Sequence, residues 1–319
     1  MEIVRIQGIE DQWDRFVWAS PGGTIFSTLR FLNYHPPLRF DFLNLAAREG
    51  SDLVSVIAGG DVERTEGRFF RAPLGASFGG FVFKDGCGLR QMLDVVEAIT
   101  ARIESLGYAG IELVLPPPCY STSDQSLPFV LGKVGYHLAK RDATFAVPLD
   151  AVEKEDLDPV LLRNLRKAEK GGINVHAATG LEGFYDVLVT NLAEKGAKPT
   201  HTREELASLF SLFPDRLILL EATLGSAVVG GCLLILCNSR VGLAFYICDD
   251  RAYSQLRVAE AALVSAASLL KRMGYKYFDL GTVSTGSDVN WGLVRFKSKF
   301  RPATYVREHY ILKFRGPPD

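Results

Sequence analysis

Apolar residues recur at helical spacing in two long segments, residues 89–106 and 258–273. Intervals of three and four residues predict amphipathic helices that bury one face. Each segment stops at a glycine, Gly107 or Gly274. Glycine often ends a helix because it adopts a left-handed backbone without steric cost. A short apolar run follows each glycine, so a strand is expected directly after each helix.

Apolar runs also precede the two helices and predict antiparallel strands. In the second half these runs are interrupted at Gly225 and Asn238, where hairpin turns are expected. The expected strands cover residues 69–70, 79–83, 111–115, 216–221, 228–236, 241–247 and 277–280. Each half therefore contains a helix, antiparallel strands, a second helix and a strand. This order is typical of an α+β fold rather than of a doubly wound parallel sheet.

Two pairs of segments suggest that the halves are copies of one unit. Residues 8–17 resemble residues 180–189, and residues 107–113 resemble residues 274–280. The matches occur in the same order and at nearly one offset, roughly 170 residues, which favours a duplication. We predict an N-terminal domain over 1–150 and a C-terminal domain over 151–319. The last strand is a candidate to pack on the N-terminal domain.

The composition agrees with two domains and limits the partners. The chain has 319 residues, and a typical domain has about 150. A hydrophobic fraction of 47% and a charged fraction of 23% are ordinary for a folded protein. Lys and Arg number 36 against 37 Asp and Glu, so no overall basic field favours DNA. A polyanion such as tRNA would depend on local cations.

The sequence also predicts the compartment. The longest apolar run, residues 227–237, is shorter than the roughly 20 residues that span a bilayer, and the N-terminus lacks a secretory signal. The five cysteines form no CxxC pair, which favours a reducing compartment. We expect a cytoplasmic protein with at most transient membrane contact. The scattered histidines predict no metal site, and no tightly bound cofactor is expected.

A basic helix is expected at residues 161–170. Arg163, Arg166, Lys167 and Lys170 are spaced by three and four residues, so most share one face. This face is interpreted either as an anion site for substrate phosphates or as a solvated surface that pairs with nearby acids.

The C-terminal stretch is the richest in candidate chemistry. The strand ending in Asp279-Leu280-Gly281 leads to a polar loop, and Asn290, Lys297 and Lys299 follow. A cation aimed at a reacting carbonyl stabilises the developing oxyanion. The alternative is an edge strand whose lysines discourage pairing with another chain.

His201 and Tyr246 are further candidates. His201 precedes a helix that Thr202 is expected to cap, with Glu205 at the capping-box position, so it is either a ligand-facing residue or an ordinary surface histidine. Tyr246 follows Phe245 on an expected strand, and one of the two should face away from the core.

Four segments together resemble the Fem-type (FemX/FemA-like) branch of the GNAT acyltransferase superfamily. They are residues 24–32, 163–175, 244–246 with the Asp-Leu-Gly at 279–281, and 292–300 with its Phe-Lys pair. The resemblance implies two tandem GNAT-like domains with mixed, largely antiparallel sheets flanked by helices. It also implies transfer of an aminoacyl or acyl group to an amine of a cell-envelope precursor or sugar, as in peptidoglycan or surface polysaccharide.

The resemblance assigns roles to individual residues. Phe296 and Lys297 fall on the pair that contacts the donor end and the transition state, and Tyr246 falls on an acceptor-contacting tyrosine. His201 stands near the family's acceptor-contacting arginine, and Phe31 replaces a common tryptophan. These departures argue against a muropeptide diphosphate as acceptor, although a nucleotide-linked or lipid-linked acceptor stays compatible.

The resemblance implies aminoacyl-tRNA or acyl-CoA as the donor. Acyl-CoA GNATs carry a glycine-containing loop before the helix that holds the pyrophosphate. Residues 251–259 contain no glycine, whereas residues 84–89 contain two. The alternatives to aminoacyl transfer are an acyl-CoA-dependent sugar-amine N-acetyltransferase and a non-catalytic binding protein on the same fold.

Overall fold

The computed structural model describes residues 1–6, 11–122, 126–150, 157–178, 180–285 and 288–314. The chain forms two compact units, Met1–Asp142 with Val306–Asp319 and Ala143–Tyr305, which are called unit 1 and unit 2 below. The sequence placed the boundary after residue 150. In the structure the division falls within strand β7 (His137–Pro148), because β7 begins in unit 1 and continues into unit 2.

Unit 1 is built on a mainly antiparallel sheet with the strand order β1-β2-β3-β4-β6-β15. The one parallel pair along this order is β4 with β6, and the last strand, β15, pairs with β6. The strands are β1 (Glu2–Ile6), β2 (Phe42–Glu49), β3 (Asp52–Arg64), β4 (Gly67–Ala72), β5 (Phe81–Phe83), β6 (Gly110–Val114) and β15 (Ala303–Lys313). The short β5 pairs with β3.

The main helix of unit 1 is α3 (Leu89–Ser105), which confirms the helix expected at residues 89–106. Its apolar face packs into the core through Val95, Val96 and Ile99. Gly107 follows in the left-handed conformation with φ 78°, as expected at a helix end. The other helices are α1 (Asp11–Ala19), α2 (Leu29–Leu32), α4 (Ser126–Val134) and the 3₁₀ turns η1 (Ile25–Ser27) and η2 (Pro118–Tyr120).

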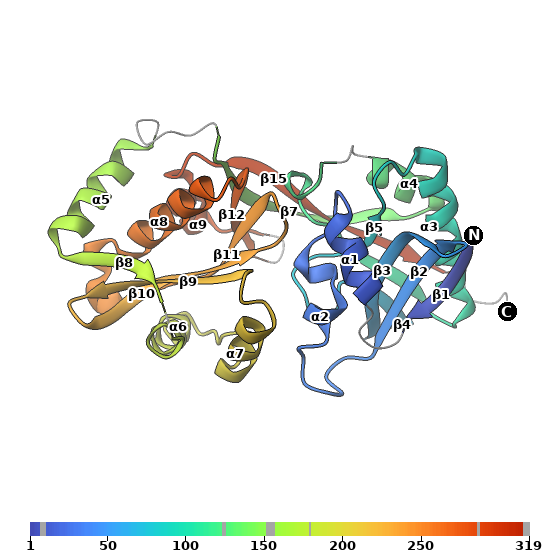
Figure 1. Cartoon of the computed structure of the whole chain (residues 1–319), viewed down its shortest axis with the longest axis horizontal. Helices are drawn as coiled ribbons and strands as arrows, with labels where there is room; N and C mark the ends of the chain where they lie inside the picture. Colours follow the sequence, from blue (N-terminus) through green and yellow to red (C-terminus); the bar gives the residue numbers. More distant parts are fainter. Residues whose placement is uncertain (7–10, 123–125, 151–156, 179, 286–287, 315–319) are drawn as a thin grey trace. The chain divides into compact units, whose positions relative to one another are not determined.

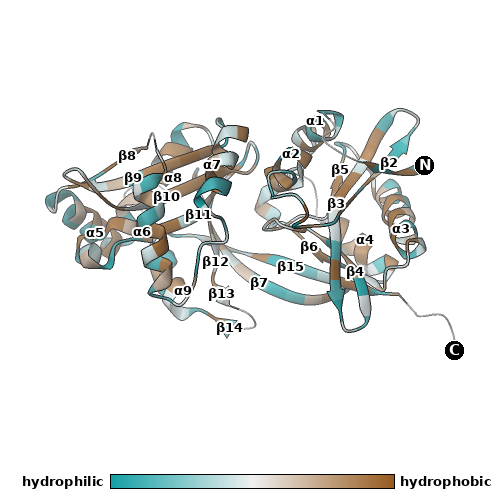
Figure 2. Cartoon of the chain, turned by 90° about the horizontal axis from the view of Figure 1, so that it is seen from below, coloured by the Kyte–Doolittle hydropathy of each residue, from teal (hydrophilic) through white to brown (hydrophobic). Residues whose placement is uncertain are grey.

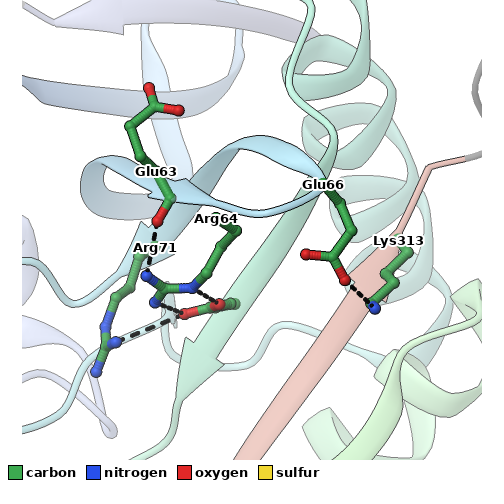
Figure 3. A network of polar contacts seen from close by, with 6 residues as sticks. Glu63, Arg64, Glu66, Arg71 and Lys313 are labelled. Carbon is green, nitrogen blue, oxygen red and sulfur yellow. Dashed lines mark hydrogen bonds and ion pairs between the residues drawn. The ribbon is translucent and has the colours of Figure 1, made fainter.

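Ion pairs join the strands of unit 1 at the surface (Figure 3). Arg64 next to the β3–β4 turn contacts both carboxylate oxygens of Glu112 on β6, at 2.7 and 2.8 Å. Lys313 on β15 contacts Glu66 at 2.7 Å. Because Lys313 and Glu66 are both exposed, we expect their pair to contribute to strand register more than to stability.

Unit 2 repeats the pattern with the strand order β7-β12-β11-β10-β9-β8. Its parallel pair is β11 with β12, and the other neighbours are antiparallel. The strands are β8 (Ile173–Ala177), β9 (Leu217–Leu224), β10 (Ala227–Leu236), β11 (Val241–Asp249) and β12 (Tyr277–Thr282), with a small hairpin of β13 (Ser284–Thr285) and β14 (Asp288–Val289). Figure 2 shows the apolar residues along β9 and β10.

The helices of unit 2 cover both faces of its sheet. Figure 1 shows α5 (Pro159–Lys170) and α8 (Val258–Arg272) on one face, and α6 (Glu182–Ala193) and α7 (Arg203–Leu212) on the other. The 3₁₀ turn η4 (Arg251–Leu256) precedes α8, and α9 (Trp291–Ser298) follows β14. The α8 helix buries Ala262, Leu263 and Ala266.

The two units share one arrangement, a parallel strand pair beside a long helix. In unit 1 this is β4 and β6 with α3, and in unit 2 it is β11 and β12 with α8. The repeats detected in the sequence lie at corresponding places. In the first, residues 11–17 lie on α1 and residues 182–189 on α6, whereas residues 8–10 lie outside the described residues, and the second lies where α3 and α8 end. The predicted fold class, tandem α+β units with mixed and largely antiparallel sheets, is therefore confirmed.

Candidate functional site

The candidate site in unit 2 centres on Lys297, which lies on α9 and is only 6% exposed. The sequence left a lysine-bearing edge strand as an alternative for this segment, and that alternative is wrong because residues 291–298 are helical. Asn290 caps the helix by accepting a hydrogen bond from the Leu293 N–H at 3.0 Å. Phe300, which is buried just after the helix, anchors its end in the core. These contacts turn Lys297 inward.

The Asp-Leu-Gly sequence at the end of β12 builds the surroundings of the lysine. Asp279 is fully buried and accepts hydrogen bonds from the Gly281 N–H at 2.7 Å and the Thr144 hydroxyl at 3.0 Å. Gly281 has φ 79°, a left-handed conformation that favours glycine. The chain turns there, and the next carbonyl, that of Thr282, accepts a hydrogen bond from Lys297 Nζ at 2.8 Å.

Burial lowers the pKa of Lys297 to about 8, and the negative charge of Asp279 acts in the opposite direction. The ammonium therefore stays protonated near neutral pH, but its solvation is poor. A cation in such a low-dielectric place interacts strongly with any negative charge that develops beside it. Thr282 engages one of its three N–H donors. The remaining donors can bind an oxyanion.

Strand β11 extends beyond its pairing with β12. The paired positions run from Val241 with Tyr277 to Leu243 with Asp279, whereas β11 continues to Asp249. The extension carries Tyr246. Backbone groups where neighbouring strands separate are available to hydrogen-bond an extended ligand.

A β-bulge in β11 allows the neighbouring side chains of Phe245 and Tyr246 both to contact His201. Leu233 pairs with Tyr246 and Leu234 with Ala244, so Phe245 is the extra residue of β11. The bulge breaks the strict alternation of side chains that the sequence predicted. Both aromatic rings contact His201, with centroids at 5.3 Å for Phe245 and 5.9 Å for Tyr246.

Tyr246 and His201 belong to one hydrogen-bonded cluster. The Tyr246 hydroxyl lies 2.9 Å from His201 Nδ1, 2.7 Å from the Thr200 hydroxyl and 3.1 Å from the Thr200 N–H. The Tyr185 hydroxyl donates to the His201 carbonyl at 3.1 Å. Burial raises the pKa of Tyr246, so its hydroxyl stays protonated over the ordinary range. His201 is buried at 9% exposure and is therefore not an ordinary surface histidine.

Sequence reasoning missed two members of this cluster. Thr200 could have been noticed because it adjoins His201, but Tyr185 on α6 gave no sequence signal. The expected cap of α7 is present, because the Thr202 side chain accepts from Glu205 N–H while the Glu205 side chain accepts from Thr202 N–H. This capping box fixes the backbone just after His201.

Phe296 and Lys299 connect α9 to α8. Lys299 Nζ lies 3.1 Å from a carboxylate oxygen of Glu260 and 5.3 Å above the Phe296 ring. Asn164 on α5 donates to the same Glu260 oxygen at 3.1 Å. Glu260 is 5% exposed and sits in the first turn of α8. Lys299 is thus engaged in a largely buried ion pair that ties three helices together.

Among the described residues, neither Arg163 nor Arg166 forms a hydrogen bond or an ion pair with the residues of this site. Both side chains are exposed on α5, as on a solvated helix face. Arg166 also borders a hollow of about 650 Å³ between α5 and α8, whose walls include Leu162, Leu165 and Val264.

The described residues contain no cluster of three or more His, Cys, Asp or Glu side chains that could hold a metal. None of the described helices is both long and apolar enough to cross a membrane.

Comparison with known proteins agrees with this architecture. Residues 160–298 match the family model described as an acetyltransferase (GNAT) domain. FemX has a similar structure, with a TM-score of 0.76 at 12% identity over 98% of each chain. The chain has the tandem GNAT fold. A tandem GNAT protein from the clavulanic acid biosynthesis pathway is similar too, with a TM-score of 0.59 at 12% identity over 100% of this chain and 99% of that one.

A third similar structure carries a different name. The C-terminal domain (DUF2156) of a putative lysylphosphatidylglycerol synthetase from Agrobacterium fabrum has a TM-score of 0.66 at 13% identity. The match covers 94% of this chain and 90% of that chain. No curated protein matches the sequence. The likeness to FemX, expected from the motifs, is thus confirmed for the fold.

Proposed function

We propose that this tandem GNAT protein is an acyltransferase that moves an aminoacyl or acyl group onto an amine of a cell-envelope precursor or sugar. The observation that carries the proposal is the buried Lys297, held at the end of β12 by the Thr282 carbonyl. The likenesses to FemX and to a putative lysylphosphatidylglycerol synthetase support aminoacyl transfer in particular.

The chemistry assigned to Lys297 is electrostatic. The acceptor amine attacks the donor carbonyl, a C–N bond forms, and the carbonyl electrons move onto oxygen. The lysine ammonium stabilises that oxyanion by a charge-assisted hydrogen bond. When the tetrahedral intermediate collapses, the C–O or C–S bond of the donor breaks and the amine proton passes to water or to the leaving group. No side chain is assigned as base.

The surroundings of α8 favour aminoacyl-tRNA over acyl-CoA as donor. The first turn of α8 holds the buried carboxylate of Glu260, which already pairs with Lys299 and accepts a hydrogen bond from Asn164. A pyrophosphate at this helix end would compete with that carboxylate. Arg257, which caps the helix in a left-handed conformation with φ 62°, supplies the backbone turn where a glycine was missing.

The roles of the other site residues follow from their contacts. Phe296 and Lys299 are proposed to line the donor end beside Lys297, and Tyr246 with His201 to position the acceptor. Arg163 and Arg166 are proposed as local cations for the phosphates of the tRNA. Asn290 is proposed to act through α9, because its side chain is engaged in the helix cap. No tightly bound cofactor is proposed.

A donor and acceptor matrix tests the proposal. The purified protein would be incubated with radiolabelled aminoacyl-tRNA or acyl-CoA, each with UDP-linked amino sugars, lipid-linked muropeptide or other sugar amines. We expect transfer that requires an aminoacyl-tRNA and a free amine. Transfer from acyl-CoA but not from aminoacyl-tRNA would instead support the alternative of an acyl-CoA-dependent sugar-amine N-acetyltransferase. Saturable binding of both substrates without turnover would contradict catalysis.

A further inference from the structure

The hollow between α5 and α8 is a cavity of about 650 Å³ on the face of the unit 2 sheet that these helices cover (Figure 1). Its walls are mostly apolar and include Val147, Leu149, Leu162, Leu165, Val264 and Phe300. Small-molecule sites in proteins typically occupy about 300–1,000 Å³ and combine apolar walls with a few polar groups. The size and lining of this space, called the α5–α8 cavity below, fall within that range.

Small residues on α8 leave the cavity open. The stripe of α8 that lines it consists of residues 264, 267, 268, 271 and 272, and the facing stripe of α5 consists of residues 162, 165, 166 and 169. Both follow the helical spacing of three and four residues. Ala267 and Ser268 lie in the middle of the α8 stripe, where a leucine would fill space. Packed helices normally interdigitate at high density, so an open stripe between them is a candidate ligand site.

The charged side chains of the wall favour an anion. Three are cationic, Arg166, Lys271 and Arg272, and one is acidic, Glu169. Lys271 already has a partner. Arg166 and Arg272 form no ion pair or hydrogen bond with the residues that the structure describes. Because a guanidinium carries five N–H donors, these two arginines can hold a carboxylate or a phosphate.

We propose that the α5–α8 cavity binds an acyl chain that ends in an anionic head group. The chain would lie against Leu162, Leu165 and Val264, and the arginines of the wall would hold the head group. A fatty-acid carboxylate and a lipid phosphate share this chemistry. Lys297 is not part of the wall, and Arg272 has no role in the reaction proposed above, so the inference does not depend on that reaction.

Calorimetric titration of the full chain would measure the affinities. The probes are octyl phosphate and octanoate as amphiphilic anions, with 1-octanol and inorganic phosphate as the separated halves. Butyl and hexyl phosphate vary the length of the chain. All would be kept below micelle-forming concentrations.

Both parts of the ligand should contribute to the affinity. We expect octyl phosphate or octanoate to bind about tenfold more tightly than 1-octanol, as one charge-assisted contact allows. From butyl to octyl phosphate each added CH₂ should tighten binding about fourfold, because the chain is buried. The difference between octyl phosphate and octanoate then shows which head group the site prefers.

Substitutions of the arginines test the head-group contact. Arg272→Ala should reduce the advantage of octyl phosphate over 1-octanol, and the double variant with Arg166→Ala should remove it. Lys170→Ala is the matched control, since Lys170 is an exposed cation of α5 outside the cavity wall. Full affinity for octyl phosphate in the double variant would overturn the proposal.

Substitutions that fill the cavity test the place of the chain. Ala267→Leu should weaken the binding of octyl phosphate and 1-octanol alike, by about tenfold or more, because the side chain takes the space of about three methylene groups. Urea unfolding would show that the variant folds. Ser268→Leu is a second filling variant, which changes a residue that is already solvent-exposed.

Hydrogen exchange locates the ligand on the native chain. Octyl phosphate should slow amide exchange in peptides from α5 and from the second half of α8, and should leave α3 of unit 1 unchanged. Equal affinity for octyl phosphate and 1-octanol would contradict the proposal. So would native affinity in both filling variants, protection outside α5 and α8 only, or absence of binding by all the probes.

Discussion

Lys297 donates a hydrogen bond from Nζ to the backbone carbonyl of Thr282 across 2.8 Å. This contact links two segments that the sequence separates by a polar loop, the end of β12 and the second turn of α9. It gives a buried ammonium a fixed direction without neutralising its charge. The proposed chemistry depends on that combination, because a cation that must reorganise during the reaction stabilises an oxyanion less.

The lowered pKa of Lys297 predicts a pH dependence of catalysis. Lys297 must be protonated to stabilise the oxyanion, so kcat/KM should fall as the pH rises past about 8. A rising limb at lower pH should report deprotonation of the acceptor amine. Steady-state rates between about pH 6 and 10 would show the profile. In Lys297→Arg, which stays charged, the fall near pH 8 should disappear even if the rate is lower.

The same burial predicts a stability effect. The pKa of Lys297 is lower in the folded chain than in the unfolded one, so its burial costs most below about pH 8, and the cost vanishes above the unfolded value of about 10.4. The pKa shift corresponds to a destabilisation of roughly 3 kcal/mol, which replacing the lysine by an apolar residue would remove. Loss of the hydrogen bond to Thr282 would offset about 1 kcal/mol of that gain in stability. Lys297→Met should therefore raise the free energy of unfolding by about 2 kcal/mol at pH 7.

Urea unfolding at several pH values would measure this effect. The gain in Lys297→Met should shrink as the pH rises through about 10, because the unfolded lysine then loses its proton as well. Lys170→Met is the control, since Lys170 is exposed on α5. A gain for Lys297→Met that does not change with pH would contradict a buried, protonated lysine.

Tyr246→Phe tests the cluster around His201. Removal of the hydroxyl leaves His201 Nδ1 with the Thr200 hydroxyl at 3.0 Å and leaves the exposed Thr200 N–H to water, so the loss should cost about 1 kcal/mol. We expect the variant to unfold at lower urea concentration with an unchanged m-value. Tyr253→Phe is the control, because the described residues offer the Tyr253 hydroxyl no hydrogen bond. Equal stability of the two variants would argue that the cluster does not form.

Two substitutions of Asn290 can distinguish a helix-capping role from direct substrate binding. Asn290→Ala should destabilise the protein by about 1 kcal/mol and lower kcat, since α9 carries Lys297. Asn290→Asp caps a helix as well as asparagine does and should restore both quantities. Unfolding curves and steady-state kinetics on the two variants measure this. A high KM that Asn290→Asp does not correct would instead assign Asn290 to substrate contact.

Much of the fold could be predicted from local patterns. The spacing of apolar residues located α3 and α8, and glycines marked their ends, because both signals act over a few neighbouring residues. The segment around Lys297 was harder. Its cations alternate as on a strand, but the Asn290 cap and the burial of Phe300 make it a helix. Long-range packing decides such cases.

The site was predictable in part for the same reason. Lys297, Phe296 and Tyr246 were found through short motifs that a sequence displays. The bond from Lys297 to Thr282, the bulge at Phe245 and the partnership of Lys299 with Glu260 depend on how distant segments pack.

Single-turnover transfer by Lys297→Ala tests the central claim most directly. With the donor and acceptor identified by the matrix above, the rate of the chemical step would be compared in the native chain, Lys297→Ala and Lys133→Ala, where Lys133 is an exposed lysine of unit 1. We expect Lys297→Ala to lose about 100-fold or more, as removal of an oxyanion-stabilising donor does. Binding of both substrates and the rate of Lys133→Ala should change little. A Lys297→Ala variant that folds and transfers at the native rate would contradict the account.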